Sequence, residues 1–392
     1  MATHDYVIDN STGANVRSDL NNVLQAILTN NSSGSAPSTT ASYMLWADTS
    51  NNLLRMRNTA NDGWVDLRTL AGGISSSADA TINSVSVGKG ANSVAGNTVL
   101  GESALDASVT GGSNTAIGKL ALTTNTSGVQ NVAVGAQSLD SNTTGQNNVA
   151  VGFRASDQIS TGSSNTSLGA FALFSNTTAN SNVAIGKDAL LSNNTGENNV
   201  AVGATALDAC TTGSSHTAVG TSALTAVTTG NFNVGIGQSA GAAITTGSSN
   251  TAVGQESLQA TTTASDNTAL GRHSLKANTT GDSNTAIGSV ALDANETGSE
   301  NVAVGRNSLG SSTTGSSNTA AGRSALSNAT TSSDNTAVGK EALTALTTGN
   351  DTVSIGSGSL KAQTTGHSNV GIGKDVGQLL TTGQENVLAG RR

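Results

Sequence analysis

Apolar residues recur along most of the chain with a period of 17 residues. From Gly101 to Gly390 a glycine stands at every seventeenth position, without insertion or deletion. The residue before this glycine is Val, Ile or Leu in nearly every repeat, and the residue three before it is always Thr or Val. β-Branched residues at alternate positions favour strands, and a fixed period of this kind is typical of solenoids. The pattern predicts a mainly β fold, an elongated β-solenoid or β-roll with one rung per 17-residue repeat over 101–392.

A second column of apolar residues follows each strand. We number positions in a repeat from its periodic glycine as zero. Leu occupies position +4 in most repeats and is missing at Ser156, Gly241 and Gly377. The same three repeats carry a large aliphatic residue at position +7, namely Ile159, Ile244 and Leu380. Burying such a side chain contributes about 1.5–3 kcal/mol, so the exchange predicts that positions +4 and +7 face one interior.

Small and polar columns complete the repeat. Position −2 is mostly Ala, which indicates that another surface approaches this face closely. If the face of small residues is exposed, it forms an apolar strip that packing into a parallel homotrimer would bury. Position −4 is Asn in all repeats except at His216 and Thr352, which predicts a ladder of amides from rung to rung. Stacked threonines such as Thr262 and Thr263 leave an ice-binding solenoid open as an alternative.

The residues before the repeats predict different elements. Between 1 and 72, apolar residues at helical spacing indicate an amphipathic helix, and three apolar runs, 43–46, 53–57 and 63–67, indicate a three-stranded meander that contains Trp46 and Trp64. So small an α+β region has little core and is expected to need a partner. The apolar positions of the helix are Val16, Leu20, Val23, Leu24, Ile27 and Leu28. Residues 73–100 form a transition, in which 84–88 and 97–101 resemble irregularly spaced rungs.

Composition and charge exclude several functions. Charged residues make up 11% of the chain and the net charge is −8, which argues against nucleic-acid binding. The single Cys210 cannot form an intrachain disulfide, and no apolar stretch is long enough for membrane insertion. No signal peptide or C-terminal anchor is apparent, as an exported bacterial adhesin would need.

No catalytic, cofactor-binding or metal-binding group is predicted. The four histidines are scattered, so no pair has the spacing of a metal site. Glycoside cleavage needs carboxylates gathered in a cleft, and the unbroken period leaves no inserted loop to build one. The chain is therefore predicted not to be an enzyme.

The repeat resembles those of two families. The unit Asn131-Val-Ala-Val-Gly135 is similar to the β-roll heads of trimeric autotransporter adhesins and to bacteriophage tail fibre and tail-spike shafts. The segments 5–24, 46–49 and 54–58 resemble the N-terminal part of structural proteins of marine tailed phages, cyanophages above all. The resemblance implies a homotrimeric virion fibre, assembled in the host cytoplasm. Its N-terminal region would dock on tail or adaptor proteins through the helix residues Val16, Leu20, Val23, Leu24 and Ile27 and through Trp46 and Trp64.

Surface variation offers candidate contact residues. Phe153, Phe171 and Phe174 lie on adjacent repeats and predict either packing between chains or a docking patch for a protein or glycan. Basic residues gather at position +1 toward the C-terminus, including Arg306, Arg323 and Lys340. They predict contact with host surface polysaccharide, although the nearby acids Glu300, Glu341 and Asp375 allow salt bridges between chains instead.

The leading interpretation is a fibre for host-cell adsorption. The alternatives are a shaft or connector that carries a separate receptor-binding tip, a bacterial trimeric adhesin, and the ice-binding solenoid.

Overall fold

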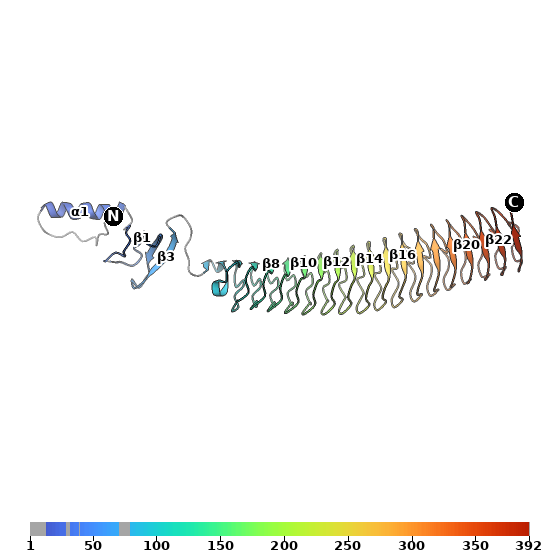
Figure 1. The fold of residues 1–392 in the computed structure, drawn as a ribbon, viewed down its shortest axis with the longest axis horizontal. Coiled ribbons are helices and arrows are strands. Elements are labelled where there is room, and N and C mark those ends of the chain that lie inside the picture. Colours follow the sequence, from blue (N-terminus) through green and yellow to red (C-terminus); the bar gives the residue numbers. More distant parts are fainter. Residues whose placement is uncertain (1–12, 29–31, 39, 70–78, 392) are drawn as a thin grey trace. The chain divides into compact units, whose positions relative to one another are not determined.

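The computed structural model describes residues 13–28, 32–38, 40–69 and 79–391. Its contacts divide the chain into two compact units, residues 1–80 and residues 81–392 (Figure 1). Of the helices in the described ranges, none has the length and hydropathy needed to cross a bilayer.

The first unit contains a helix and a small antiparallel sheet. The helix is α1 (Gly13–Leu28), and the strands are β1 (Leu45–Asp48), β2 (Leu53–Arg57) and β3 (Trp64–Thr69), paired in the order β1-β2-β3. β1 lies two residues later than the predicted run 43–46, because Tyr43 adopts a positive φ of 66° that no strand accommodates. Asp48 ends β1 and accepts hydrogen bonds from the backbone N–H groups of Ser50 and Asn51.

The second unit begins with a short irregular segment. It contains β4 (Ala80–Ile82), β5 (Val85–Gly88) and the single 3₁₀ turn η1 (Ala91–Ser93). β5 pairs antiparallel with β6 (Thr98–Gly101). The prediction that residues 84–88 form a rung is therefore wrong, because every rung of the coil pairs in parallel with the next; 97–101 is the first regular rung.

The rest of the second unit is a regular coil. Each turn contributes one short strand, β7 (Thr115–Ile117), β8 (Val132–Val134), β9 (Val149–Val151), β10 (Thr166–Leu168), β11 (Val183–Ile185), β12 (Val200–Val202), β13 (Thr217–Val219), β14 (Val234–Ile236), β15 (Thr251–Val253), β16 (Thr268–Leu270), β17 (Thr285–Ile287), β18 (Val302–Val304), β19 (Thr319–Ala321), β20 (Thr336–Val338), β21 (Val353–Ile355), β22 (Val370–Ile372) and β23 (Val387–Ala389).

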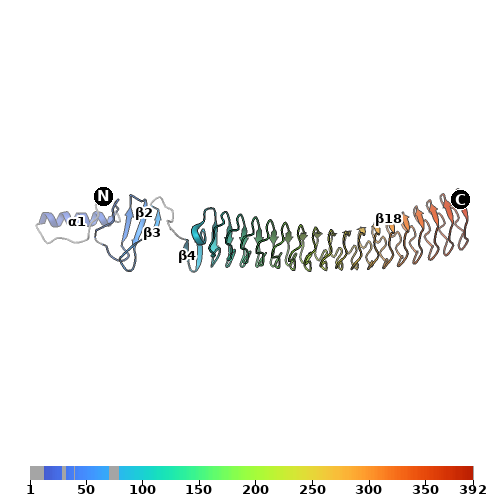
Figure 2. The same ribbon diagram turned by 60° about the horizontal axis from the view of Figure 1, so that its bottom comes forward.

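Neighbouring turns pair in parallel and in register from β6 to β23. Residues 17 apart face each other, as Thr251 faces Thr268 and Val253 faces Leu270. Figures 1 and 2 show the strands stacked in one row along this unit. Strands in a sheet lie about 4.8 Å apart, so the ladder is roughly 80 Å long. The predicted β-solenoid with 17-residue rungs is confirmed.

The periodic glycine is required by the backbone. Its φ lies between 126° and 140° in the repeats from Gly118 to Gly390, a region that side chains rarely allow. A Cβ atom at Gly254 would lie 2.6 Å from the carbonyl oxygen of Gly271 in the next turn. The glycine therefore permits both the bend after each strand and the close stacking of turns.

The interior of the coil holds the columns at −2, +4 and +7. The Ala residues at −2, such as Ala252, are fully buried inside the coil against the Leu column. These small residues do not form an exposed strip, because the middle residue of each three-residue strand points inward, where the turns pack closely. Ile244 is also fully buried, and a Cβ atom on Gly241 would lie 2.9 Å from its Cδ1 atom. Positions +4 and +7 thus share one interior, as predicted.

The predicted asparagine ladder is present and closes each turn. The backbone N–H of Asn131 donates to Oδ1 of Asn114 one turn earlier, at 2.9 Å. The side-chain amide of Asn131 donates to the carbonyl oxygen of Gly145 at 2.8 Å, which ties the start of the turn to its end. Direct amide-to-amide bonds also occur, as from Asn250 to Asn233 at 3.1 Å.

Candidate functional site

The predicted docking helix presents part of its apolar face. Leu20 is 45% exposed and Leu24 is 50% exposed, whereas Val16 and Val23 are half-buried. The side chain of Ile27 lies outside the described residues. Exposed leucines on one side of a helix are typical of a surface that packs against another chain.

The two predicted tryptophans pack together in the small sheet. Trp46 is buried, and its ring lies 5.1 Å from that of Trp64. Arg55 stacks over Trp46 and bonds the buried carboxylate of Asp48 at 3.1 Å, while Arg57 stacks over Trp64. These contacts give both tryptophans a structural role in holding three short strands together.

The three predicted phenylalanines form a cluster at the corner after the strand. The ring of Phe171 lies 5.4 Å from that of Phe153 and 5.8 Å from that of Phe174, in edge-to-face geometry. Arg154, which sequence reasoning missed, stacks over Phe174 at 4.7 Å and bonds Asp157 at 2.5 Å. Its signal in the sequence was its place beside Phe153. We call Phe153, Arg154, Phe171 and Phe174 the aromatic cluster; Phe153 remains 47% exposed.

The predicted basic residues lie in one row on the surface. We define the basic row as the exposed cations at position +1 in the C-terminal half of the coil, which are Arg272, Arg306, Arg323, Lys340, Lys374 and Arg391. Glu341 takes up part of this charge, because it bonds Arg323 at 2.9 Å and Lys361 at 2.6 Å and lies 3.7 Å from Lys340. The hydrogen bond from Lys361 lowers the pKa of Glu341 below its ordinary value.

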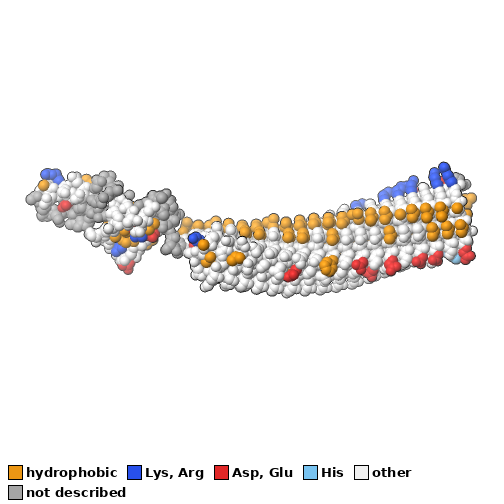
Figure 3. Space-filling model, in the orientation of Figure 1, with side chains coloured by type: hydrophobic (Ala, Val, Ile, Leu, Met, Phe, Trp, Pro, Cys, Tyr) orange, Lys and Arg blue, Asp and Glu red, His pale blue; other side chains and the backbone are white. Residues whose placement is uncertain are grey.

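An apolar strip runs beside the basic row. We define the apolar strip as the side chains at −1 together with the valines at −3, which point outward from the strands of the ladder; threonine occupies the other −3 positions. At −1 these include Leu168, Leu270 and Ile372, which are 46–47% exposed. Figure 3 shows one orange row along the second unit and a second, interrupted row beside it. A contiguous apolar surface of this length marks an interaction site in a folded protein.

Cys210 and His216, whose side chain types are often reactive, are both buried. Cys210 lies at position +7 inside the coil, and burial raises the pKa of its thiol to about 12. His216 takes the place of a ladder asparagine, and its Nδ1 atom accepts a hydrogen bond from the backbone N–H of Asn233 at 3.2 Å. Burial lowers the pKa of His216.

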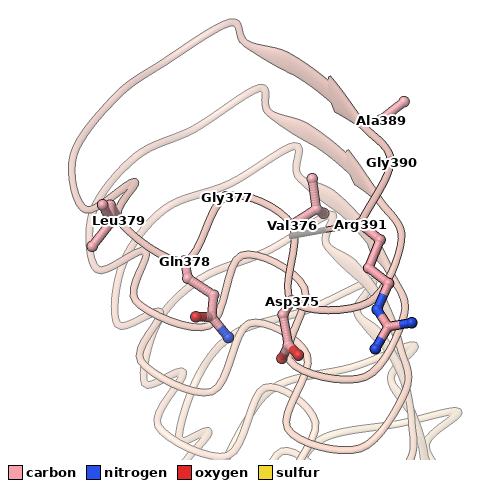
Figure 4. Close-up of a pocket in the computed structure, with 8 residues that line it drawn as sticks. All are labelled: Asp375, Val376, Gly377, Gln378, Leu379, Ala389, Gly390 and Arg391. Atoms are coloured by element: carbon pink, nitrogen blue, oxygen red, sulfur yellow. The ribbon is translucent and has the colours of Figure 1, made fainter.

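One open recess lies at the last turn. It measures about 320 Å³, and its lining includes Asp375, Val376, Leu379 and Arg391 (Figure 4). Its apolar floor corresponds to the interior that a following turn covers elsewhere in the coil. In the part of the chain that the structure describes, no group of three or more His, Cys, Asp or Glu side chains is placed to hold a metal ion.

The threonine columns differ in exposure. The hydroxyl of Thr262 donates to the carbonyl oxygen of Thr279 in the next turn, at 3.4 Å, while the neighbouring Thr263 is exposed. Only the second column thus faces solvent, in agreement with the alternation of a stacked coil.

Comparisons of the chain with family models, with curated proteins and with solved structures find no match.

Proposed function

We propose that this chain is the subunit of a homotrimeric virion fibre that projects from a phage tail and helps the particle adsorb to its host cell. The observation that carries the proposal is the uninterrupted parallel ladder from β6 to β23. It gives a stiff rod of roughly 80 Å without an inserted loop. The similarity of the repeat to phage fibre shafts supports the same function.

Docking on the virion is assigned to the first unit. Leu20 and Leu24 leave an apolar helix face uncovered, which suits attachment to a tail or adaptor protein. The sheet with Trp46 and Trp64 serves as the folded support of that attachment.

Contact with the host is assigned to side chains on the outside of the rod. The aromatic cluster combines one exposed and two half-buried rings with a guanidinium group, a combination that suits both glycans and proteins. Each contact is weak, but three chains per fibre and several fibres per particle multiply them, so avidity supplies the strength of adsorption.

Immunoelectron microscopy of the virion tests this function. An antibody against residues 1–72 is expected at the end of the fibre nearest the particle, and an antibody against the last repeats at the far end. The opposite order of the two labels would refute the docking assignment. Absence of both labels from purified virions, with labelling of the bacterial surface instead, would favour the adhesin alternative.

A further inference from the structure

A row of acidic residues lies along the edge of the apolar strip opposite to the basic row. We define the acidic row as the exposed carboxylates at position −5, which are Asp266, Glu300, Asp334, Asp351 and Glu385. Figure 3 shows red side chains along one edge of the strip and blue side chains along the other, in the C-terminal half of the coil. The face is thus acidic on one side, apolar in the middle and basic on the other side.

Acid and base occur together in the same turns. Four of the turns carry a carboxylate at −5 and a cation at +1, six residues apart; the pairs are Asp266 with Arg272, Glu300 with Arg306, Asp334 with Lys340, and Glu385 with Arg391. The strand between the two positions separates them by at most roughly 20 Å. Among the described residues, no ion pair joins the acidic row to a cation of the same chain.

The symmetry of a parallel assembly would bring these rows together. When copies are related by rotation about an axis along the rod, the acidic edge of one face meets the basic edge of the next, and equivalent turns lie at the same height. The four pairs would then form between chains at equal levels. In an antiparallel assembly the rotation axis crosses the rod, so acidic edges meet acidic edges and like charges repel.

We propose that the face formed by the acidic row, the apolar strip and the basic row is the surface on which a second copy of this chain packs, parallel and in register. This inference rests on the homotrimer of the proposed function and identifies its interchain surface. The apolar strip supplies the driving force of association, because its side chains leave water. The charge rows select the direction and favour the register. In register they form four opposite-charge pairs, whereas a slip by one turn leaves two or three and sets either Glu300 or Asp334 opposite Arg323.

Cross-linking of the purified full-length chain tests direction and register. In the turn of Gly288 both edge positions are serine, Ser283 and Ser289, so cysteines can replace them without disturbing a charge. With a short bis-maleimide, the double variant Ser283→Cys/Ser289→Cys is expected to give covalent dimers and trimers, and each single variant only monomers. Cross-linked dimers of a single variant, or a monomeric rod in sedimentation, would overturn the proposal.

Charge exchange tests the role of the rows. Changing Asp266, Glu300, Asp334 and Glu385 to Lys is expected to weaken association about tenfold or more at low salt, and less at high salt. Changing the four paired cations to Glu as well is expected to restore it. All these residues are exposed, and circular dichroism checks that each variant folds.

A different occupant of the face would give a different result. If the wild-type rod is monomeric and binds heparin through the basic row, the row serves a polyanion and the proposal is wrong. Parallel cross-links in a protein that is absent from virions would keep this interface while refuting the proposed function.

Discussion

Replacement of a single ladder asparagine should open the coil locally. Asn250 is fully buried, and its side-chain amide donates to the carbonyl oxygen of Ala264 at 2.8 Å. Its Oδ1 atom accepts the backbone N–H of Asn267 in the next turn, at 3.1 Å. Asn250→Ala removes the side chain that bonds both the carbonyl oxygen of Ala264 and the N–H of Asn267. Neither of these backbone groups has another hydrogen-bond partner among the described residues.

The expected cost follows from the two groups left unpaired. A buried donor or acceptor without a partner costs about 1–3 kcal/mol, so the variant should lose roughly 2–6 kcal/mol of local stability. The loss should stay near the altered turn, because each turn of a solenoid contacts only its neighbours. A single global free energy of unfolding is therefore a poor measure of the effect.

Amide hydrogen exchange at the backbone of Asn267 measures the effect directly. Its exchange should accelerate about 30-fold or more in Asn250→Ala, since each 1.4 kcal/mol corresponds to a factor of ten. Asn250→Asp keeps the acceptor for Asn267 and loses the amide that donates to Ala264 and Asn233, so it should weaken the turn while the Asn267 amide stays more protected than in the Ala variant. Ser249→Ala, at an exposed neighbouring position, is the control. Unchanged exchange at Asn267 in the Ala variant would refute the ladder as a source of stability.

Three further outcomes test other parts of the coil. Burial lowers the folded-state pKa of His216, so the coil should lose stability as the pH falls from above the ordinary histidine pKa through the lowered value. His216→Asn should remove this pH dependence in hydrogen exchange measured at several pH values. Equal slopes of stability against pH in both proteins would contradict the assignment. Because burial raises the pKa of the Cys210 thiol to about 12, a maleimide should label it only after unfolding, and prompt labelling of the native protein would disprove its burial. Gly254→Ala should disrupt the coil in circular dichroism, because its φ of 126° is one that side chains rarely allow. Gly281→Ala should be milder, because its φ is not positive and other repeats carry Ala at that position, as Ala179 and Ala264 show; equal effects would refute the argument.

Periodicity was sufficient to predict the coil and its interior. The exchange of Gly241 and Ile244 showed that two columns share one space, because the loss of one side chain is compensated by the gain of the other in the same turn. The Asn column was equally informative, since identical amides stacked one above another in successive turns have no better partner than each other and the adjoining backbone. Both predictions need only the period and the volume of side chains.

Whether a given column of side chains points inward or outward was harder to predict. Alanine at −2 can serve a tight interior or a close interface, and only the strand alternation in three dimensions decides that Ala252 points inward. Leu258 adopts a positive φ of 49°, a conformation that is uncommon for leucine, so no propensity argument predicts the bend that carries it into the core. Of the acidic row, the sequence pointed only to Glu300, as an acid near the basic residues; only the structure places the row at the opposite edge of the apolar strip.

The columns that build the coil leave few places for recognition. Positions −4, −2, +4 and +7 are buried, and the periodic glycine is fixed by its φ, so substitution there disturbs every neighbouring turn. Variable side chains are therefore confined to outward positions, where −5 and +1 alternate between neutral and charged residues without any change in the backbone. Because the ladder repeats each position at about 4.8 Å, a chain of this design can change its partner by altering rows of surface side chains. In the proposed parallel assembly, specificity would be concentrated in the C-terminal half, where both charge rows lie.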